Sequence, residues 1–135
     1  MEQQKDIRWK QRFHNFKNAF SFLSKAVKIA DPSEIEEAGI IQAYEFTFEL
    51  AWKTLKDYLE FNNVEVKFPR DTIKESFRYE LIDSGDIWMD MLDKRNLMSH
   101  TYDEAGAQLA VDLIKNAYFP QILKLHNLLS DKYNG

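Results

Sequence analysis

The sequence predicts an all-α protein, an up-and-down bundle of about five helices around a four-helix core. Only four glycines and three prolines punctuate the 135 residues, far fewer than the turns of an all-β fold require. Apolar residues recur instead at steps of three and four along most of the chain, which is the period of an amphipathic helix. Because no change in composition marks a linker, residues 1–135 are expected to form a single domain.

The first expected helix spans residues 5–29. Its apolar stripe consists of Trp9, Phe13, Phe16, Phe20, Leu23 and Val27. A series of aromatic side chains could in principle stack on nucleic-acid bases. The helical spacing favours packing in the core or at a dimer interface instead.

A second helix is expected to follow Asp31-Pro32-Ser33-Glu34, with Asp31 as the capping acceptor and the proline in the first turn. Its end is predicted at Asn62-Asn63. The next segment, residues 64–68, alternates apolar and polar side chains like a β-strand. Because it has no partner strand and precedes a proline, we expect an extended connector.

Three further helices are expected, over residues 70–81, over residues 87–99, and from a cap at Asp103 onward. Pro120 interrupts the last of them. A proline inside a helix removes one backbone hydrogen bond and clashes with the preceding turn, at a cost of about 3 kcal/mol. The sequence therefore predicts a kink or a restart of the helix at this position.

Composition excludes several classes of function. The absence of cysteine removes disulfides, thiolate zinc sites and a cysteine nucleophile. No glycine-rich phosphate loop, nucleophile elbow or metalloprotease motif is present. The net charge of −4 disfavours extensive binding to phosphates, so any contact with nucleic acid must be local. No stretch approaches the roughly 18 apolar residues of a membrane helix, and we expect a cytoplasmic protein.

The chemically richest segment lies between the fourth and fifth expected helices and contains Arg95, Asn96, Ser99, His100 and Tyr102. On a continuous helix, Arg95 and His100 would be about 140° apart and would not share a face. We therefore expect the helix to end between them, near Ser99. His100 can then turn back towards Arg95, with Tyr102 in the turn that follows.

Structural roles for the same side chains stay open. Arg95 could form an ordinary surface ion pair. The carboxylates near it in sequence are those of Asp90, Asp93 and Glu104. His100 could interact with the dipole at a helix C-terminus, and Tyr102 could pack its ring against the bundle.

Two other sets of polar residues are expected to carry no chemistry. Carboxylates at steps of three or four could suggest a cation site, but a solvated helix face is the favoured interpretation. They are Asp83, Asp86, Asp90 and Asp93. His14 and His126 have no carboxylate at metal-ligand spacing and are expected to be structural or exposed. We expect neither a metal nor a cofactor.

The string from Arg95 to His100, Arg-Asn-Leu-Met-Ser-His, resembles the signature of the HEPN superfamily, in which an arginine and a polar residue precede a histidine at the end of a bundle helix. His100-Thr101-Tyr102 is similar to the extension found in HEPN toxins paired with minimal nucleotidyltransferase antitoxins, a subgroup also called nucleotidyltransferase substrate-binding proteins. Three further strings resemble this subgroup: Phe46-Thr47-Phe48-Glu49-Leu50-Ala51-Trp52-Lys53, Phe68-Pro69-Arg70-Asp71 and Trp88-Met89-Asp90-Met91.

The resemblance implies a homodimer whose two motifs line one cleft, and a metal-independent endoribonuclease that acts on RNA. Arg95 would bind the phosphate, because a guanidinium contacts two oxygens at once and stabilises developing charge. His100 would transfer a proton, since its pKa lies near neutrality. Asn96 and Ser99 would support these two residues.

The resemblance also implies a separately encoded minimal nucleotidyltransferase, an antitoxin that forms a hetero-oligomer with the chain and adenylylates Tyr102. Negative phosphates beside the motif would oppose RNA binding. An alternative is a non-catalytic subunit that presents a substrate or nucleotide to the nucleotidyltransferase, which the acidic pI slightly favours. A purely structural bundle would leave the Arg-His-Tyr combination to coincidence.

Overall fold

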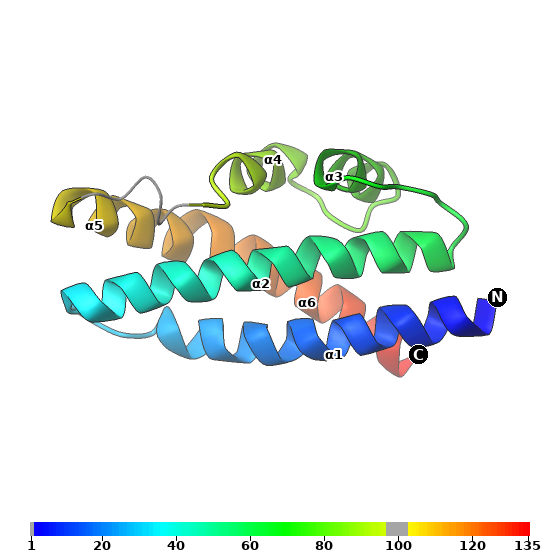
Figure 1. Ribbon diagram of the computed structural model, residues 1–135, viewed down its shortest axis with the longest axis horizontal. Helices are drawn as coiled ribbons and strands as arrows, with labels where there is room; N and C mark the ends of the chain where they lie inside the picture. The colour runs from blue at the N-terminus through cyan, green and yellow to red at the C-terminus, as the bar shows by residue number, and fades with distance from the viewer. Residues whose placement is uncertain (1, 97–102) are drawn as a thin grey trace.

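The computed structural model describes residues 2–96 and 103–135, and all regular structure within these ranges is helical (Figure 1). The predicted all-α class is therefore confirmed. The elements are α1 (Glu2–Ala26), α2 (Glu34–Phe61), α3 (Pro69–Arg78), α4 (Gly85–Asp93), α5 (Glu104–Leu113), the π-helical segment η2 (Ile114–Tyr118) and α6 (Phe119–Asn134).

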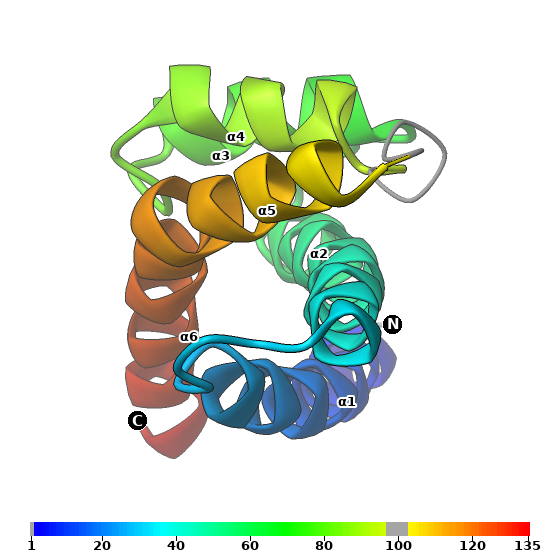
Figure 2. The same cartoon turned by 90° about the vertical axis from the view of Figure 1, so that its left-hand side faces the viewer.

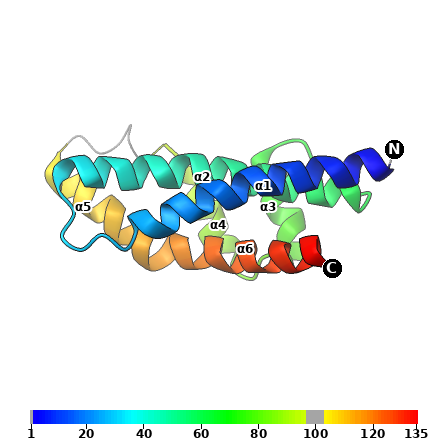
Figure 3. The same ribbon diagram turned by 90° about the horizontal axis from the view of Figure 1, so that it is seen from below.

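The long helices α1 and α2 run antiparallel and pack along their lengths, and α6 runs beside them (Figure 3). The short helices α3 and α4 lie on the side of α2 that faces away from α1, across the long axis of the molecule (Figures 1 and 2). Helices α1, α2 and α6 therefore run along the bundle, and α3 and α4 form a crosswise pair on its α2 side.

The aromatic stripe of α1 lies in the core, as predicted. Trp9, Phe13, Phe16 and Phe20 are all buried and form part of one continuous apolar cluster with side chains from α2, α4 and α6. The His126 ring on α6 stacks on Phe20 with centroids 4.3 Å apart, so this histidine is structural. His14 is exposed on α1. Both histidines therefore have the roles predicted for them.

The start of α2 differs from the prediction. Ser33, not Asp31, is the N-cap: its hydroxyl accepts a hydrogen bond from the Glu36 N–H at 3.2 Å, and the Glu36 carboxylate accepts one from the Ser33 N–H at 2.9 Å. Asp31 has a φ of 48°. An N-cap residue normally adopts an extended backbone, so the left-handed conformation excludes Asp31 from that position.

The ends of α2 and α3 share one geometry. A residue with positive φ follows each helix, Asn63 (66°) after α2 and Glu80 (62°) after α3. In each case the next residue donates its N–H back across the last turn, from Val64 to Leu59 O at 2.9 Å and from Leu81 to Ser76 O at 2.8 Å. This is the Schellman arrangement. It confirms the predicted end of α2.

The same arrangement ends α3 three residues before the predicted boundary at residue 81. The prediction was wrong because the apolar stripe continues into Leu81 and Ile82, which are buried but lie outside the helix. Residues 64–68 form no strand and connect α2 to α3, as predicted.

Asp103 caps α5, as predicted, by accepting a hydrogen bond from the Gly106 N–H at 2.8 Å. Beyond α5 the chain widens into the π-helical segment, in which the Phe119 N–H donates to Ile114 O, five residues back. The α6 helix then begins with Pro120 in its first turn, where a missing N–H costs least. The predicted restart is confirmed, and Figure 2 shows the accompanying change of direction.

None of the described helices combines the length and the apolar composition needed to span a membrane.

The cap assignment predicts different effects for two neighbouring substitutions. Ser33→Ala should lower the free energy of unfolding by about 1 kcal/mol, because it leaves the first turn of α2 without its side-chain acceptor. Asp31→Gly should not destabilise the protein, because glycine adopts a positive φ without strain. Denaturant titration of both variants measures the difference. A larger loss for Asp31→Gly than for Ser33→Ala would contradict the assignment.

Candidate functional site

The α4 helix ends at Asp93, six residues before the boundary predicted near Ser99. Lys94 is the C-cap residue, and the Arg95 N–H reaches back only three residues, to Leu92 O at 3.4 Å. The helix thus tightens into a turn that contains Arg95 and Asn96. The angle of about 140° between Arg95 and His100 was derived for a continuous helix. Since Arg95 lies beyond the end of α4, that angle does not describe these two residues.

Ser99, His100 and Tyr102, which the sequence predicts as the rest of the site, lie outside the described residues. The structure therefore bears on the site through Arg95, Asn96 and the elements that hold them. Both side chains are exposed.

A polar cluster under the end of α4 fixes the start of this turn. The buried Tyr118, in the π-helical segment, donates its hydroxyl hydrogen bond to the Asp90 carboxylate. Lys94 donates to the other oxygen of that carboxylate at 2.6 Å. Tyr44, on α2, donates to Met91 O at 3.1 Å, and its ring stacks on Tyr118 with centroids 5.2 Å apart. These contacts join α2, the end of α4 and the π-helical segment, close to Arg95 in the sequence.

The charges in this cluster are well defined. Burial raises the pKa of Tyr118 above its ordinary value, and the hydrogen bond to Asp90 raises it further, so the phenol stays protonated and donates. Burial alone would raise the pKa of Asp90, but the hydrogen bonds from Lys94 and Tyr118 outweigh it and hold this pKa below 3.8. Asp90 is therefore an anion at neutral pH.

An open groove of about 410 Å³ lies between the start of α3 and the end of α4. Its lining residues are Phe68, Pro69, Arg70, Leu92, Asp93, Arg95 and Asn96. Arg70 pairs with Asp93 across the groove, with Nη2 and Oδ1 3.2 Å apart. Two guanidinium groups, those of Arg70 and Arg95, therefore belong to one groove.

The alternative role for Arg95 as one half of a surface ion pair gains no support. Asp90 is occupied by Lys94 and Tyr118, and Asp93 pairs with Arg70. Within residues 2–96 and 103–135, Arg95 forms no ion pair with these two carboxylates or with Glu104. In the described part of the chain, its exposed guanidinium therefore has no carboxylate partner.

Sequence reasoning did not place Phe68, Arg70 or Tyr118 at the site. Phe68 and Arg70 belong to a string that resembles the subgroup, which was the only signal for them. They lie more than twenty positions before Arg95, and only the packing of α3 against α4 brings them to the same groove. The apolar stripe of the last expected helix includes Tyr118, but no local pattern indicates its contact with Asp90.

The carboxylate run of α4 forms no cation site in the described part of the chain, where no group of three or more potential metal ligands occurs. Asp83, Asp90 and Asp93 each pair with a lysine or an arginine instead.

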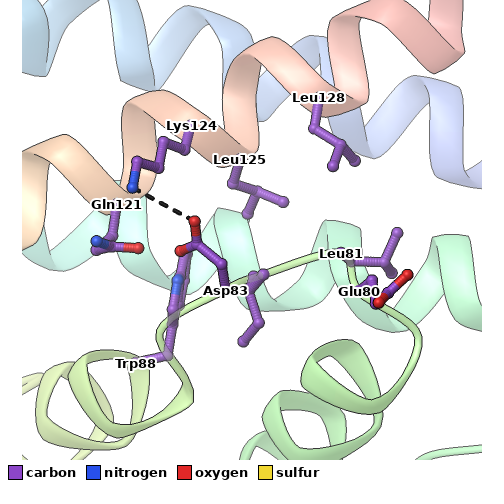
Figure 4. A pocket seen from close by; sticks show the side chains of 9 residues that line it. Glu80, Leu81, Asp83, Trp88, Gln121, Lys124, Leu125 and Leu128 are labelled. Atoms are coloured by element: carbon purple, nitrogen blue, oxygen red, sulfur yellow. Dashed lines mark hydrogen bonds and ion pairs between the residues drawn. The ribbon is translucent and has the colours of Figure 1, made fainter.

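A smaller cavity of about 120 Å³ shares no lining residue with the groove. Figure 4 shows it between the loop after α3 and the side chains of α6, bounded by the Lys124–Asp83 ion pair at 3.4 Å. The buried Trp88 Nε1 has no partner among the described protein atoms. A cavity of this size holds a few water molecules at most.

Comparisons with known proteins agree with the motif. Residues 11–131 match the sequence model of a family described as nucleotidyltransferase substrate binding protein like. The probable ribonuclease HepT of Haemophilus influenzae is 29% identical over 128 residues, which cover 80% of this chain and 88% of that protein. A crystal structure of a Thermus thermophilus protein, 27% identical, has a TM-score of 0.74 and covers 89% of this chain and 99% of that one.

The lowered pKa of Asp90 predicts a pH-dependent contribution to stability. The ionised carboxylate stabilises the folded state above pH 3.8, and this stabilisation is lost as the pH falls below that value towards the folded pKa. The free energy of unfolding of wild type should therefore exceed that of Asp90→Asn most at neutral pH, and the difference should shrink below pH 3.8. Denaturant titrations across this range measure it.

Tyr118→Phe serves as the control. In the wild-type background its cost should also shrink at low pH, whereas in the Asp90→Asn background it should not depend on pH. A wild-type to Asp90→Asn difference that stays constant across the range would contradict the prediction.

Proposed function

The chain belongs to the nucleotidyltransferase substrate binding protein like family, in its HepT-like HEPN subgroup, and from this membership we propose that it is a metal-independent endoribonuclease, the toxin of a toxin–antitoxin pair. The observation that carries the proposal is the exposed Arg95, at the start of the motif, in an open groove and without a carboxylate partner in the described part of the chain. The relative named a probable ribonuclease supports the same reaction.

Arg95 binds the scissile phosphate in this proposal. A guanidinium forms two parallel hydrogen bonds to phosphate oxygens and stabilises the charge that builds up as the phosphorus is attacked. The amide of Asn96 lines the same groove and supplies a further hydrogen-bonding group. Ser99 is proposed to support the same geometry from the other end of the motif.

His100 transfers the protons. It removes the proton of the ribose 2′-hydroxyl, whose oxygen then bonds to phosphorus while the bond from phosphorus to the 5′-oxygen breaks. The departing 5′-oxygen takes up a proton, so the products are a cyclic phosphate and a free 5′-hydroxyl. Atoms and charges balance without a metal or an oxidant. General acid–base catalysis of this kind contributes about 10²–10⁴-fold in rate.

We propose that the active form is a homodimer in which the two motifs line one cleft, as in the proteins that the motif resembles. A separately encoded minimal nucleotidyltransferase forms a hetero-oligomer with it and silences it. This antitoxin transfers AMP to Tyr102: the phenol oxygen bonds to the α-phosphorus of ATP, and pyrophosphate leaves. Each added phosphate brings negative charge close to Arg95 in the sequence.

The cleavage proposal predicts loss of activity in two variants. RNA cleavage by the unmodified protein, measured with EDTA present, should fall roughly 10²–10³-fold in Arg95→Ala and about 10²–10⁴-fold in His100→Ala. Arg95→Lys should recover only part of the rate, because an ammonium group cannot bind two oxygens in the same plane.

Arg78→Ala is the matched control, since Arg78 is an exposed arginine on α3 whose ion pair is to Glu75 of the same helix. Cleavage that persists in both Arg95→Ala and His100→Ala, or that requires a divalent metal, would refute the mechanism. No cleavage by the unmodified wild type would favour a non-catalytic substrate-binding subunit, the role that the family description names.

The modification proposal predicts a single adenylylated tyrosine. Incubation with the nucleotidyltransferase and ATP should add AMP to wild type and abolish RNA cleavage. Tyr102→Phe should stay unmodified and active under the same conditions. Intact-mass and peptide mass spectrometry locate the addition, and Tyr79→Phe, which removes an exposed tyrosine at the C-cap of α3, is the control. Modification of Tyr102→Phe at another site with loss of activity would overturn the assignment.

A further inference from the structure

We propose that Phe68 and Arg70 form a nucleotide subsite beside Arg95, in which Phe68 stacks on one base of single-stranded RNA and Arg70 binds the phosphate next to the scissile one. The inference rests on the proposed function and adds the substrate form to it. Both residues line the groove that contains Arg95 and Asn96.

Phe68 has an aromatic side chain that is exposed to solvent, and hydrogen bonds constrain its backbone. Its side chain is 65% exposed. The residue is extended, as the following proline requires, and its carbonyl accepts hydrogen bonds from both the Thr72 N–H at 3.0 Å and the Thr72 hydroxyl at 2.9 Å. Ring contacts within the described part of the chain do not include Phe68, whereas the exposed Phe22 stacks on Phe46. Base stacking requires an exposed ring with a free face, and here the backbone that carries the ring is fixed by hydrogen bonds.

Arg70 follows Phe68 by two residues and is already oriented across the groove. Its guanidinium contacts the Met89 sulfur at 3.6 Å and Asp93 at 3.2 Å. The Arg70 and Asp93 side chains are both largely exposed, and an ion pair between exposed groups contributes little to stability. A phosphate can therefore replace the Asp93 carboxylate on Arg70 at low cost, and it offers two oxygens in the geometry that a guanidinium prefers.

The combination favours single-stranded RNA over a duplex, because paired bases do not expose their faces to a stacking ring. The protein has a net charge of −4, and only two guanidinium groups line the groove. We therefore expect the protein to contact few phosphates of the RNA. For two neutralised phosphates of a single strand, the logarithm of the binding constant should fall with the logarithm of salt concentration with a slope of about −1.4. Loss of Arg70 should reduce that slope to about −0.7.

The experiment measures binding of a short fluorescent single-stranded RNA by anisotropy, in the His100→Ala background, in which cleavage is expected to be too slow to interfere. Phe68→Ala should weaken binding roughly five- to 150-fold, and Phe68→Trp should restore it, because the stacking surface returns. An abasic oligonucleotide of the same length should bind Phe68→Ala and the parent equally. A loss of folding would not produce this dependence on the bases.

Arg70→Ala should weaken binding to both oligonucleotides and halve the salt dependence. Asp93→Asn should strengthen binding by up to about fivefold, since it frees Arg70 and removes a like charge from the groove. The matched controls come from α3: Phe77→Ala removes another exposed ring, and Arg78→Ala removes another exposed guanidinium, both outside the groove. Neither control should change binding.

The outcomes separate the two proposals. If the parent binds and wild type cleaves RNA, while Phe68→Ala and Arg70→Ala match their controls, the subsite is wrong and the ribonuclease proposal stands. If the parent does not bind RNA and wild type does not cleave it, both the proposed function and the subsite are wrong. If the two substitutions leave RNA binding intact but weaken the complex with the nucleotidyltransferase, the groove is a protein interface and the subsite is overturned.

Discussion

The hydrogen bond from Tyr118 to Asp90 is the contact on which the geometry of the groove depends. A nine-residue helix such as α4 is too short to be stable alone in water. It is held because Asp90 binds Tyr118 of the π-helical segment and Lys94 of its own last turn, while Tyr44 of α2 holds the carbonyl of Met91. These contacts, and not the intrinsic helix propensity of its residues, determine where α4 ends. They therefore also determine the position of Arg95, which follows that end.

The π-helical segment makes that contact possible. A π-helical turn contains more residues than an α-helical turn, and the apolar residues on either side of Ile114–Tyr118 belong to the same core cluster. Val111 before the segment, Ile114 within it, and Ile122 and Leu125 after it all remain buried. Tyr118 can therefore lie in the core with its hydroxyl directed at Asp90. Pro120 is compatible with this arrangement, because it lies in the first turn of α6, where its missing N–H is tolerated.

Sequence reasoning predicted the structure correctly where a local pattern of residues determines it. The stripe from Trp9 to Phe20, the extended connector, the cap at Asp103 and the restart at Pro120 all follow from local rules. It failed at boundaries set by backbone conformations that a stripe does not reveal: Asp31 and Glu80 adopt positive φ, and α4 tightens at Lys94. For the site, the motif predicts roles for Arg95 and Asn96 that stay predictions, and the structure shows only that both residues line the groove. Phe68 and Arg70 reach the same groove only through tertiary packing. The roles of Ser99, His100 and Tyr102 stay predictions.

The charge balance of the groove links catalysis to its proposed control. Two arginines are set against Asp93 in a protein that is acidic overall, so the attraction for RNA is local and small. A groove with two arginines is sensitive to each added anion. Under the proposed function, one phosphodiester on Tyr102 would oppose the positive charge that Arg95 and Arg70 provide. A strongly basic groove would need steric closure to be silenced. If this groove binds RNA as proposed, the charge of the proposed modification should weaken that binding without steric closure.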